Sequence, residues 1–274
     1  MRFGKLIAFV SALSLVATLA ATKVEAAETL LIGLTDGNTL VQFNSAQPAL
    51  AKPIQVTDVS GTLIGIDFRP ANGLLYGLSD QNILYTIDPE TGKATQVSIL
   101  STPFTGGINS GVDFNPAADR LRLVGSNDQN FRVNVDTGAV ADEGDGIPGD
   151  RNLAYATTDI NTGKDPNITA AGYTNSVVGA TTTRLYNIDT TLDTLVIQDP
   201  PNNGTLFTVG SLGVDFGPRT GFDIFVDRNG VNYGFAVSNS VLYAIDLAIA
   251  KATPVGVVGT GRFTFFGLVA LRSR

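Results

Sequence analysis

The sequence contains a repeated unit, and this repetition constrains the fold more than any other feature. Residues 65–88 read GIDFRPANGLLYGLSDQNILYTID, and residues 221–246 read GFDIFVDRNGVNYGFAVSNSVLYAID. A third copy begins at residue 111 with GVDFNPAADRLRLVGSNDQNFRVNVDTG, and a weaker fourth copy extends over residues 168–210. One unit is therefore about 46 to 57 residues long. Self-similarity at such a spacing indicates a repeat architecture.

Each unit has the pattern of several short β-strands. Short β-branched and aromatic runs, in which apolar and polar residues alternate as in residues 84–87, are separated by Gly, Asn, Asp and Pro. The turn sequences DPETG (residues 88–92) and DTG (residues 136–138) recur between the runs, and Asp and Gly favour tight turns. No segment of the mature chain has a convincing helical period. Four short strands in a unit of this length are typical of a β-propeller blade.

The two ends of the chain complete the number of blades. Residues 30–56 look like the last three strands of a blade that lacks its first strand, and residues 263–271 look like one apolar strand without a blade. Pairing these ends would remove exposed sheet edges. We therefore predict an all-β propeller of four-stranded antiparallel blades, with five blades closed by the N- and C-terminal strands. Six blades are the alternative, if residues 139–167 contain another, whereas a β-sandwich would not explain the regular units.

The N-terminus has the pattern of a signal peptide. Arg2 and Lys5 precede the uncharged, mostly apolar residues 6–21, and the tripeptide VEA at the end of residues 1–26 fits a cleavage site. The apolar run is shorter than the roughly 20 residues of a spanning helix. An uncleaved membrane anchor is the alternative. We expect residues 27–274 to form a single propeller domain that is secreted or periplasmic, with no stable membrane span after cleavage.

Composition excludes several kinds of chemistry. The chain contains no His and no Cys, which excludes Ser-His-Asp and Cys-His catalysis, zinc sites built on His or thiolate, and disulfides. Of the 18 basic and 25 acidic residues, three basic and one acidic lie in the signal peptide, so the mature chain has a net charge of −9. Because phosphate neutralisation needs clustered Lys and Arg, we expect no nucleic-acid partner.

Several motifs together resemble a known family. The recurring G-[IV]-D-F-x-P, the run DRLRLVGSNDQNFRVNVDTG (residues 119–138) and ITAAGYTNS (residues 168–176) resemble the secreted bacterial family known as domain of unknown function 4394. The resemblance covers residues 29–271, and the motifs match in order. It implies a propeller-like fold and export. It implies no activity, because the family has no assigned reaction.

Four aspartates recur in a Gly-x-Asp-Phe or Gly-x-Asp-Ile context: Asp67, Asp113, Asp215 and Asp223. On innermost strands, such carboxylates would converge on the central channel. There they would raise one another's pKa or bind a hard cation such as Ca²⁺. The alternative is structural, with each Asp fixing a blade turn through backbone amides. Asp215 and Asp223 are only eight residues apart, so at most one of them fits the equivalent position.

A second candidate site combines arginines with amides in the third copy. Its residues are Asp113, Asn115, Arg120, Arg122, Asn130 and Arg132. Arg120 and Arg122 alternate with leucines and therefore share one face of a strand, while Arg132 lies on the next strand. Such a face could bind an anion or carboxylate, because guanidinium groups bind oxygens bidentately. In the alternative interpretation the arginines pair with the recurring aspartates and join adjacent blades.

A third candidate is the acidic, glycine-rich loop of residues 142–150. Its carboxylates resemble hard-cation ligands, but the spacing does not match an EF-hand, and an exposed solvated loop is the favoured interpretation.

Two functions remain open, besides a passive structural unit without a ligand. We favour a secreted, non-enzymatic binding or interaction module for a small molecule, a glycan or a protein, because no catalytic set is recognisable. The alternative is a Ca²⁺-dependent hydrolase of a lactone, ester or glycan that uses the channel carboxylates.

Overall fold

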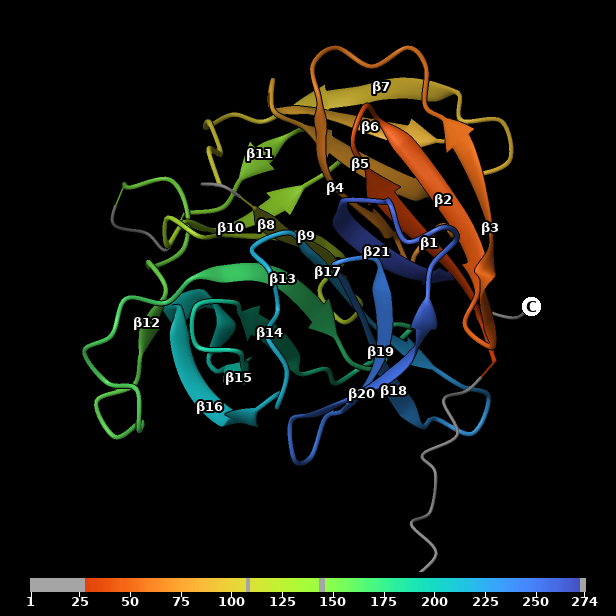
Figure 1. Ribbon diagram of the computed structural model, residues 1–274. Coiled ribbons are helices and arrows are strands. Elements are labelled where there is room, and N and C mark those ends of the chain that lie inside the picture. The colour runs from red at the N-terminus through yellow and green to blue at the C-terminus, as the bar shows by residue number, and fades with distance from the viewer. Residues whose placement is uncertain (1–27, 107–108, 143–145, 272–274) are drawn as a thin grey trace, which may run out of the picture.

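The structure, a computed structural model, describes residues 28–106, 109–142 and 146–271. In these ranges the chain forms five small sheets arranged around a common axis as the blades of a propeller (Figure 1). The predicted five-bladed all-β architecture is confirmed. The predicted signal peptide, residues 1–26, lies outside the described residues.

The strands of each blade follow one another from the channel outward. Blade one consists of β21 (Phe265–Leu271), β1 (Leu30–Thr35), β2 (Thr39–Asn44) and β3 (Gln47–Gln55). Blade two consists of β4 (Leu63–Phe68), β5 (Leu75–Ser79), β6 (Ile83–Ile87) and β7 (Ala94–Ile99). Blade three consists of β8 (Ser110–Asn115), β9 (Arg120–Gly125), β10 (Asn130–Asn134) and β11 (Ala139–Val140).

Blade four consists of β13 (Ile168–Tyr173), β14 (Leu185–Asp189), β15 (Thr194–Gln198) and β16 (Thr205–Ser211). A two-residue strand, β12 (Ala154–Tyr155), pairs in parallel with β16, and the short 3-10 helix η1 (Pro201–Asn203) precedes β16. Blade five consists of β17 (Thr220–Val226), β18 (Asn232–Ser238), β19 (Val241–Asp246) and β20 (Lys251–Val257).

The two ends of the chain close the propeller in blade one. Strand β21 pairs antiparallel with β1, so that Leu31 lies opposite Ala270 and Gly33 lies opposite Leu268. In Figure 1 these strands, drawn in blue and red, lie side by side although they come from opposite ends of the chain. The described part of residues 139–167 contains only β11 and β12. The six-bladed alternative is therefore wrong.

Burial follows the radial position of a strand. The middle strands β5 and β14 are buried along their whole length, because adjacent blades cover both of their faces. The outermost strands β7 and β20 are mostly exposed. A hydrophobic cluster fills the space between adjacent blades; between blades one and two, for example, Ile32 and Leu34 pack with Leu63 and Ile66. The core is thus distributed around the axis.

The inner strands approach one another too closely for side chains at some repeated glycines. A Cβ added at Gly111 would lie 2.6 Å from Ala171 Cβ, and one added at Gly221 would lie 2.5 Å from the carbonyl carbon of Gly267. The Gly of the recurring Gly-x-Asp motif is therefore required by close packing around the axis.

A hairpin residue with positive φ joins consecutive blades. Asn38, Asn82 and Asp193 each occupy the turn between the second and third strands of a blade. Their Oδ1 atoms accept hydrogen bonds from the main-chain N–H groups of Leu63 (2.7 Å), Phe104 (2.7 Å) and Phe216 (2.8 Å), respectively, in each case at the start of the next blade. The Asn and Asp residues of these turns thus connect each blade to the next one by a hydrogen bond.

Blade three departs from this arrangement at Asp128. Asp128 has the same positive φ, yet its buried Oδ1 has no hydrogen-bond partner among the described residues. Burial, followed by the negative charge of Asp165, raises the pKa of Asp128 to about 6. The folded protein therefore holds a proton that the unfolded chain, with an Asp pKa of about 3.9, has released.

The Asp128 carboxyl is expected to lower the free energy of unfolding as pH rises from about 4 to about 6, and Asp128→Asn should remove this contribution. Asn at the equivalent positions 38 and 82 adopts the same backbone conformation. Because Asp128 is partly exposed, we expect the variant to be more stable than the wild type by only about 1 kcal/mol at pH 7, with no difference near pH 4. Urea unfolding between pH 4 and 7 measures this. An equal difference at both pH values would contradict it.

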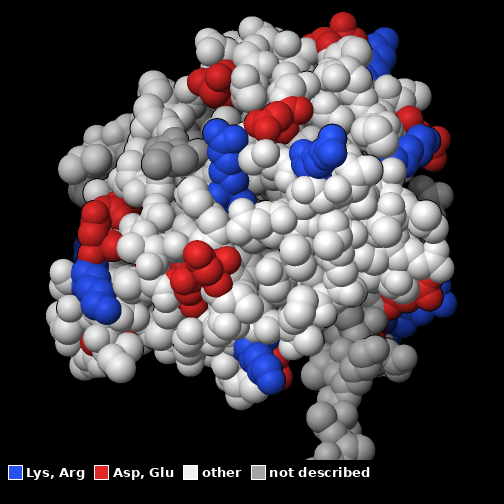
Figure 2. Space-filling view, viewed as in Figure 1, with Lys and Arg blue, Asp and Glu red and all other residues white. Residues whose placement is uncertain are grey.

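No helix in the described ranges is long and apolar enough to cross a bilayer. On the face seen in Figure 2, charged side chains lie in small scattered groups, several of which contain both acidic and basic residues.

Candidate functional site

Three of the four recurring aspartates come together beside the propeller axis. Asp67 lies on β4, Asp113 on β8 and Asp223 on β17, and one carboxylate oxygen of each lies within 4.8 Å of the others. All three are buried, with exposed fractions of 4%, 3% and 6%. Asp215, in contrast, is exposed in the loop before β17 and lies outside this cluster.

Main-chain N–H groups hold these carboxylates in place. Asp67 Oδ1 accepts the N–H of Phe68, and Asp67 Oδ2 accepts the N–H of Phe114 on the next inner strand, both at 2.7 Å. Asp113 Oδ1 accepts the N–H of Tyr173, on the inner strand of blade four, at 3.1 Å. The structural alternative for the recurring Asp is thus realised between neighbouring inner strands and not within a turn.

The third carboxylate follows the same rule. Asp223 Oδ1 accepts the N–H of Ile224 and Asp223 Oδ2 accepts that of Ala270 on β21, both at 2.6 Å. In blades four and one the position of the recurring Asp is occupied by Gly172 and Val269. These residues come directly before Tyr173 and Ala270, whose N–H groups donate to the carboxylates. The carboxylates therefore come from blades two, three and five and meet beside the axis.

Proximity makes one of the three carboxyl groups a weaker acid. Burial, followed by the negative charges of Asp67 and Asp223, raises the pKa of Asp113 well above its usual range. Protonated Asp113 also hydrogen-bonds to Asp223. Asp113 therefore keeps its proton to a higher pH than an ordinary Asp and reduces the repulsion within the cluster.

Asp67 and Asp223 also line a pocket of about 350 Å³ where the inner strands β4, β17 and β21 end. Polar and apolar groups share its wall about equally, and its remaining lining residues are Phe68, Arg69, Pro70, Asn72, Gly73, Leu74, Ser176, Ile224, Phe225, Val226, Ala270 and Leu271. We call this space the mouth pocket.

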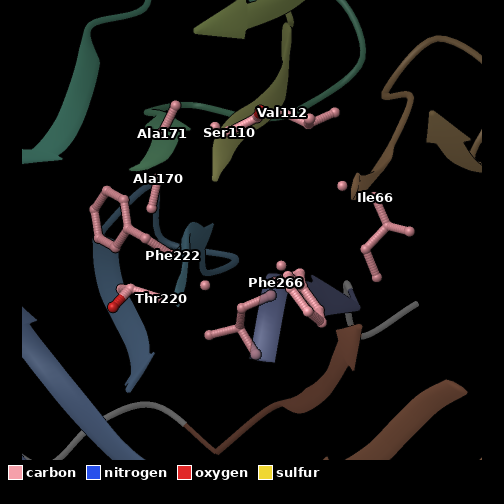
Figure 3. A pocket seen from close by; sticks show the side chains of 13 residues that line it. Ile66, Ser110, Val112, Ala170, Ala171, Thr220, Phe222 and Phe266 are labelled. Carbon is pink, nitrogen blue, oxygen red and sulfur yellow. The ribbon is translucent and has the colours of Figure 1, made fainter. Parts of the chain in front are cut away.

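The channel between the inner strands is much narrower than the mouth pocket. Figure 3 shows labelled residues from all five inner strands around it, among them Ile66, Val112, Ala171, Phe222 and Phe266. The cavity that they enclose is only about 10 Å³, roughly the space of one water-sized sphere. A ligand larger than water would therefore reach Asp67 and Asp223 from the mouth pocket.

Arg69 lines the mouth pocket, but it forms ion pairs with two carboxylates outside the pocket. Its guanidinium donates two hydrogen bonds to Asp119, at 2.8 and 2.6 Å, and two to Asp136, at 2.7 and 3.1 Å. The hydrogen bonds to Asp119 and then Asp136 raise the pKa of Arg69 above its usual value. These bonds join blade two to the turns of blade three.

The residues of the arginine-rich candidate site do not come together in one site. Arg122 is only 2% exposed and donates hydrogen bonds to Asp150, Asn130, Asn202 and Tyr173. Arg132 Nε lies 2.9 Å from both carboxylate oxygens of Asp150. These contacts join blades three and four, as in the alternative interpretation, but the partner is Asp150 and not the recurring aspartates.

The other members of that candidate site lie in turns or on the surface. Asn115 Oδ1 accepts the N–H groups of Ala117 and Ala118 in the turn after β8, and half-buried Arg120 donates to the carbonyl of Asp119. Of the six predicted residues, Asp113 alone belongs to the aspartate cluster. A role of the others in binding stays a prediction.

The acidic loop differs from its favoured interpretation at one end. Residues 143–145 lie outside the described residues, but Asp150, at the end of the loop, is only 8% exposed and holds the two arginines. An internal ion cluster thus replaces the expected solvated side chain.

Sequence reasoning did not identify the mouth pocket. Its polar rim includes Arg69 and Asn72 from blade two and Ser176 from blade four. One feature of the sequence could have indicated it. The residues directly after the recurring Asp must lie where the inner strands end, and several of them line this pocket.

Comparisons with known proteins give one family match. The sequence profile of a family described as Domain of unknown function (DUF4394) matches residues 39–268. A comparison with curated proteins finds no match.

Solved structures of low sequence identity resemble the fold. A protein of unknown function from Bacteroides thetaiotaomicron VPI-5482 is 16% identical, with a TM-score of 0.48, over 89% of this chain and 64% of that one. An auxiliary nutrient binding protein from Bacteroides ovatus ATCC 8483 is 13% identical, with a TM-score of 0.41, over 81% of this chain and 58% of that one. This chain thus spans less than two thirds of either protein, and similarity at this level carries no inference about function.

Proposed function

The chain belongs to the family described as Domain of unknown function (DUF4394), and from the site that its propeller presents we propose that it is a binding protein for a small molecule held in the mouth pocket. The pocket itself carries this proposal. Its volume of about 350 Å³ lies within the usual range of ligand sites, and its wall combines apolar side chains with fixed polar groups. Asp67 and Asp223 supply two of these groups on rigid strands.

Rigidity supports binding at this place. Each of the two carboxylates is fixed by main-chain donors on two strands, so little side-chain freedom would be lost when a ligand arrives. The apolar wall would supply the hydrophobic part of the binding energy.

One observation favours a second candidate, the Ca²⁺-dependent hydrolase. Carboxylate oxygens within 4.8 Å of one another suit a hard cation, which would polarise an ester, lactone or glycosidic group. Against this, Ca²⁺ takes six to eight oxygen ligands, whereas the cluster brings together three carboxylates. We therefore rank this candidate second.

We also propose that the protein is exported to the periplasm or the extracellular space. The signal-peptide pattern of residues 1–26 supports this. N-terminal sequencing of the exported protein, with Ala27 as the expected first residue, tests it.

The binding proposal is tested by filling the mouth pocket. Ser176→Trp places an indole at the pocket wall, whereas Val178→Trp places one two residues further along, at a side chain that is 70% exposed and does not line the pocket. The probes are a fragment library of cations, neutral molecules and anions, and CaCl₂ with a chelator control. A fragment at tenfold excess over its Kd should stabilise the native state by about 1.4 kcal/mol.

We expect fragments that raise the Tm of the wild type and of Val178→Trp, and that lose this effect in Ser176→Trp. If no fragment raises the Tm, or if Ser176→Trp responds like Val178→Trp, the proposal fails. A response to CaCl₂ without a response to organic fragments would favour the hydrolase.

A further inference from the structure

We propose that the ligand of the mouth pocket is an organic cation, a protonated amine joined to an apolar group. This inference rests on the proposed binding function and names the chemical class of its ligand. The ammonium group would lie against Asp67 and Asp223, and the apolar group would lie against the pocket wall.

The first step of the argument is charge. Two carboxylates, Asp67 and Asp223, line the pocket, and Arg69 is the one basic residue among the lining residues that the structure describes. Because the Arg69 guanidinium also bonds to Asp119 and Asp136, negative charge exceeds positive charge around the pocket. A ligand that carries a positive charge would therefore gain energy here, while an anion would be repelled.

The second step is burial. The two pocket carboxylates are only 4% and 6% exposed, so their charges have lost most of their contact with bulk water. Charge-assisted hydrogen bonds are about twice as strong as neutral ones. An ionised carboxylate can accept about four hydrogen bonds, and each of these two accepts two main-chain N–H groups. An ammonium group, with three N–H donors, matches such a pair of acceptors.

The third step is the shape and polarity of the wall. Phe68 and Leu74 of blade two face the same pocket as Ile224 and Phe225 of β17, and Leu74 is 49% exposed. A bare metal ion would leave this apolar surface in water, because the pocket is far larger than an ion. A neutral sugar would leave the carboxylate charges uncompensated. An amine with a hydrocarbon or aromatic group satisfies both parts of the pocket.

The test compares probes of similar shape and different charge. 2-Phenylethylamine is a cation at pH 7, 2-phenylethanol is its neutral analogue, and 3-phenylpropionate is an anion. We expect isothermal titration calorimetry to give a Kd for the amine at least tenfold below that of the alcohol, with no detectable binding of the anion. Ser176→Trp should abolish amine binding, and Val178→Trp should not.

Charge at the rim supplies a second measurement that does not disturb the aspartate cluster. Leu74→Glu, Leu74→Gln and Leu74→Lys lose the same apolar contact and differ in charge. Amine affinity should decrease in that order, with about a fivefold or larger difference between the Glu and Lys variants, while the alcohol should be unaffected. Asp223→Asn should bring the affinities for amine and alcohol within threefold of each other, if that variant folds.

Three results would overturn the inference. These are equal affinity for amine and alcohol, binding of the alcohol or the anion alone at the Ser176-dependent site, and no effect of charge at position 74. In the second case the binding function stands and the ligand class is wrong. If neither the fragments nor these probes bind, the binding function itself fails.

Discussion

Replacing Arg122 by Met is expected to lower the free energy of unfolding by about 3 to 5 kcal/mol, the usual cost of removing one partner from a buried ion pair. Arg122 is 2% exposed, and its guanidinium bonds to four side chains, among them the carboxylate of Asp150, which is itself buried. Without the guanidinium, Asn202 and Tyr173 lose a buried partner, and Asp150 keeps the partly exposed Arg132 as a partner. Urea unfolding monitored by circular dichroism measures the loss.

The matched control lies two residues away on the same strand. Arg120 is half-buried and donates to a main-chain carbonyl, so Arg120→Met should change stability by less than about 1 kcal/mol. Equal losses in the two variants would show that the buried network does not stabilise the contact between blades three and four. If Arg122→Met does not fold, Arg122→Lys, which keeps the charge but not the planar group of donors, should show a smaller loss in the same direction.

This contrast between neighbouring arginines shows a limit of sequence analysis. Alternation with leucines correctly places Arg120 and Arg122 on one face of β9. The sequence could not tell which arginine would be buried, because that depends on residues distant in the chain. Tyr173 and Asn202 come from blade four, and Asp150 comes from an irregular loop.

The fold was more predictable than the site because equivalent residues of the repeats occupy equivalent positions relative to the propeller axis. Once residues 65 and 111 are recognised as equivalent, the aspartates two positions later must face the same part of the axis, as Asp67 and Asp113 do. The motif misled at Asp215, where the same Gly-x-Asp-Phe letters occur in a loop. The mouth pocket was not predictable, because three blades and a loop contribute to its wall and no local pattern records their separation.

A second large effect is expected at the repeated glycine of blade five. A Cβ at Gly221 would lie 2.5 Å from the carbonyl carbon of Gly267 and 2.7 Å from the nitrogen of Leu268. Main-chain atoms of an inner strand cannot move aside as a flexible side chain can, so Gly221→Ala must push β17 and β21 apart. Overpacking of this kind costs about 1 to 3 kcal/mol.

Gly267 provides the control for this substitution, since it lies across the same contact on β21. A Cβ at Gly267 would come no closer than 3.5 Å to Ile66, an ordinary van der Waals distance. Gly267→Ala should therefore be neutral or stabilise the protein by up to about 1 kcal/mol, because Ala loses less backbone entropy than Gly on folding. Urea unfolding of both variants decides the matter. Similar stabilities would mean that the inner strands can separate without cost, whereas the expected difference would show that the close contact between β17 and β21 stabilises the propeller.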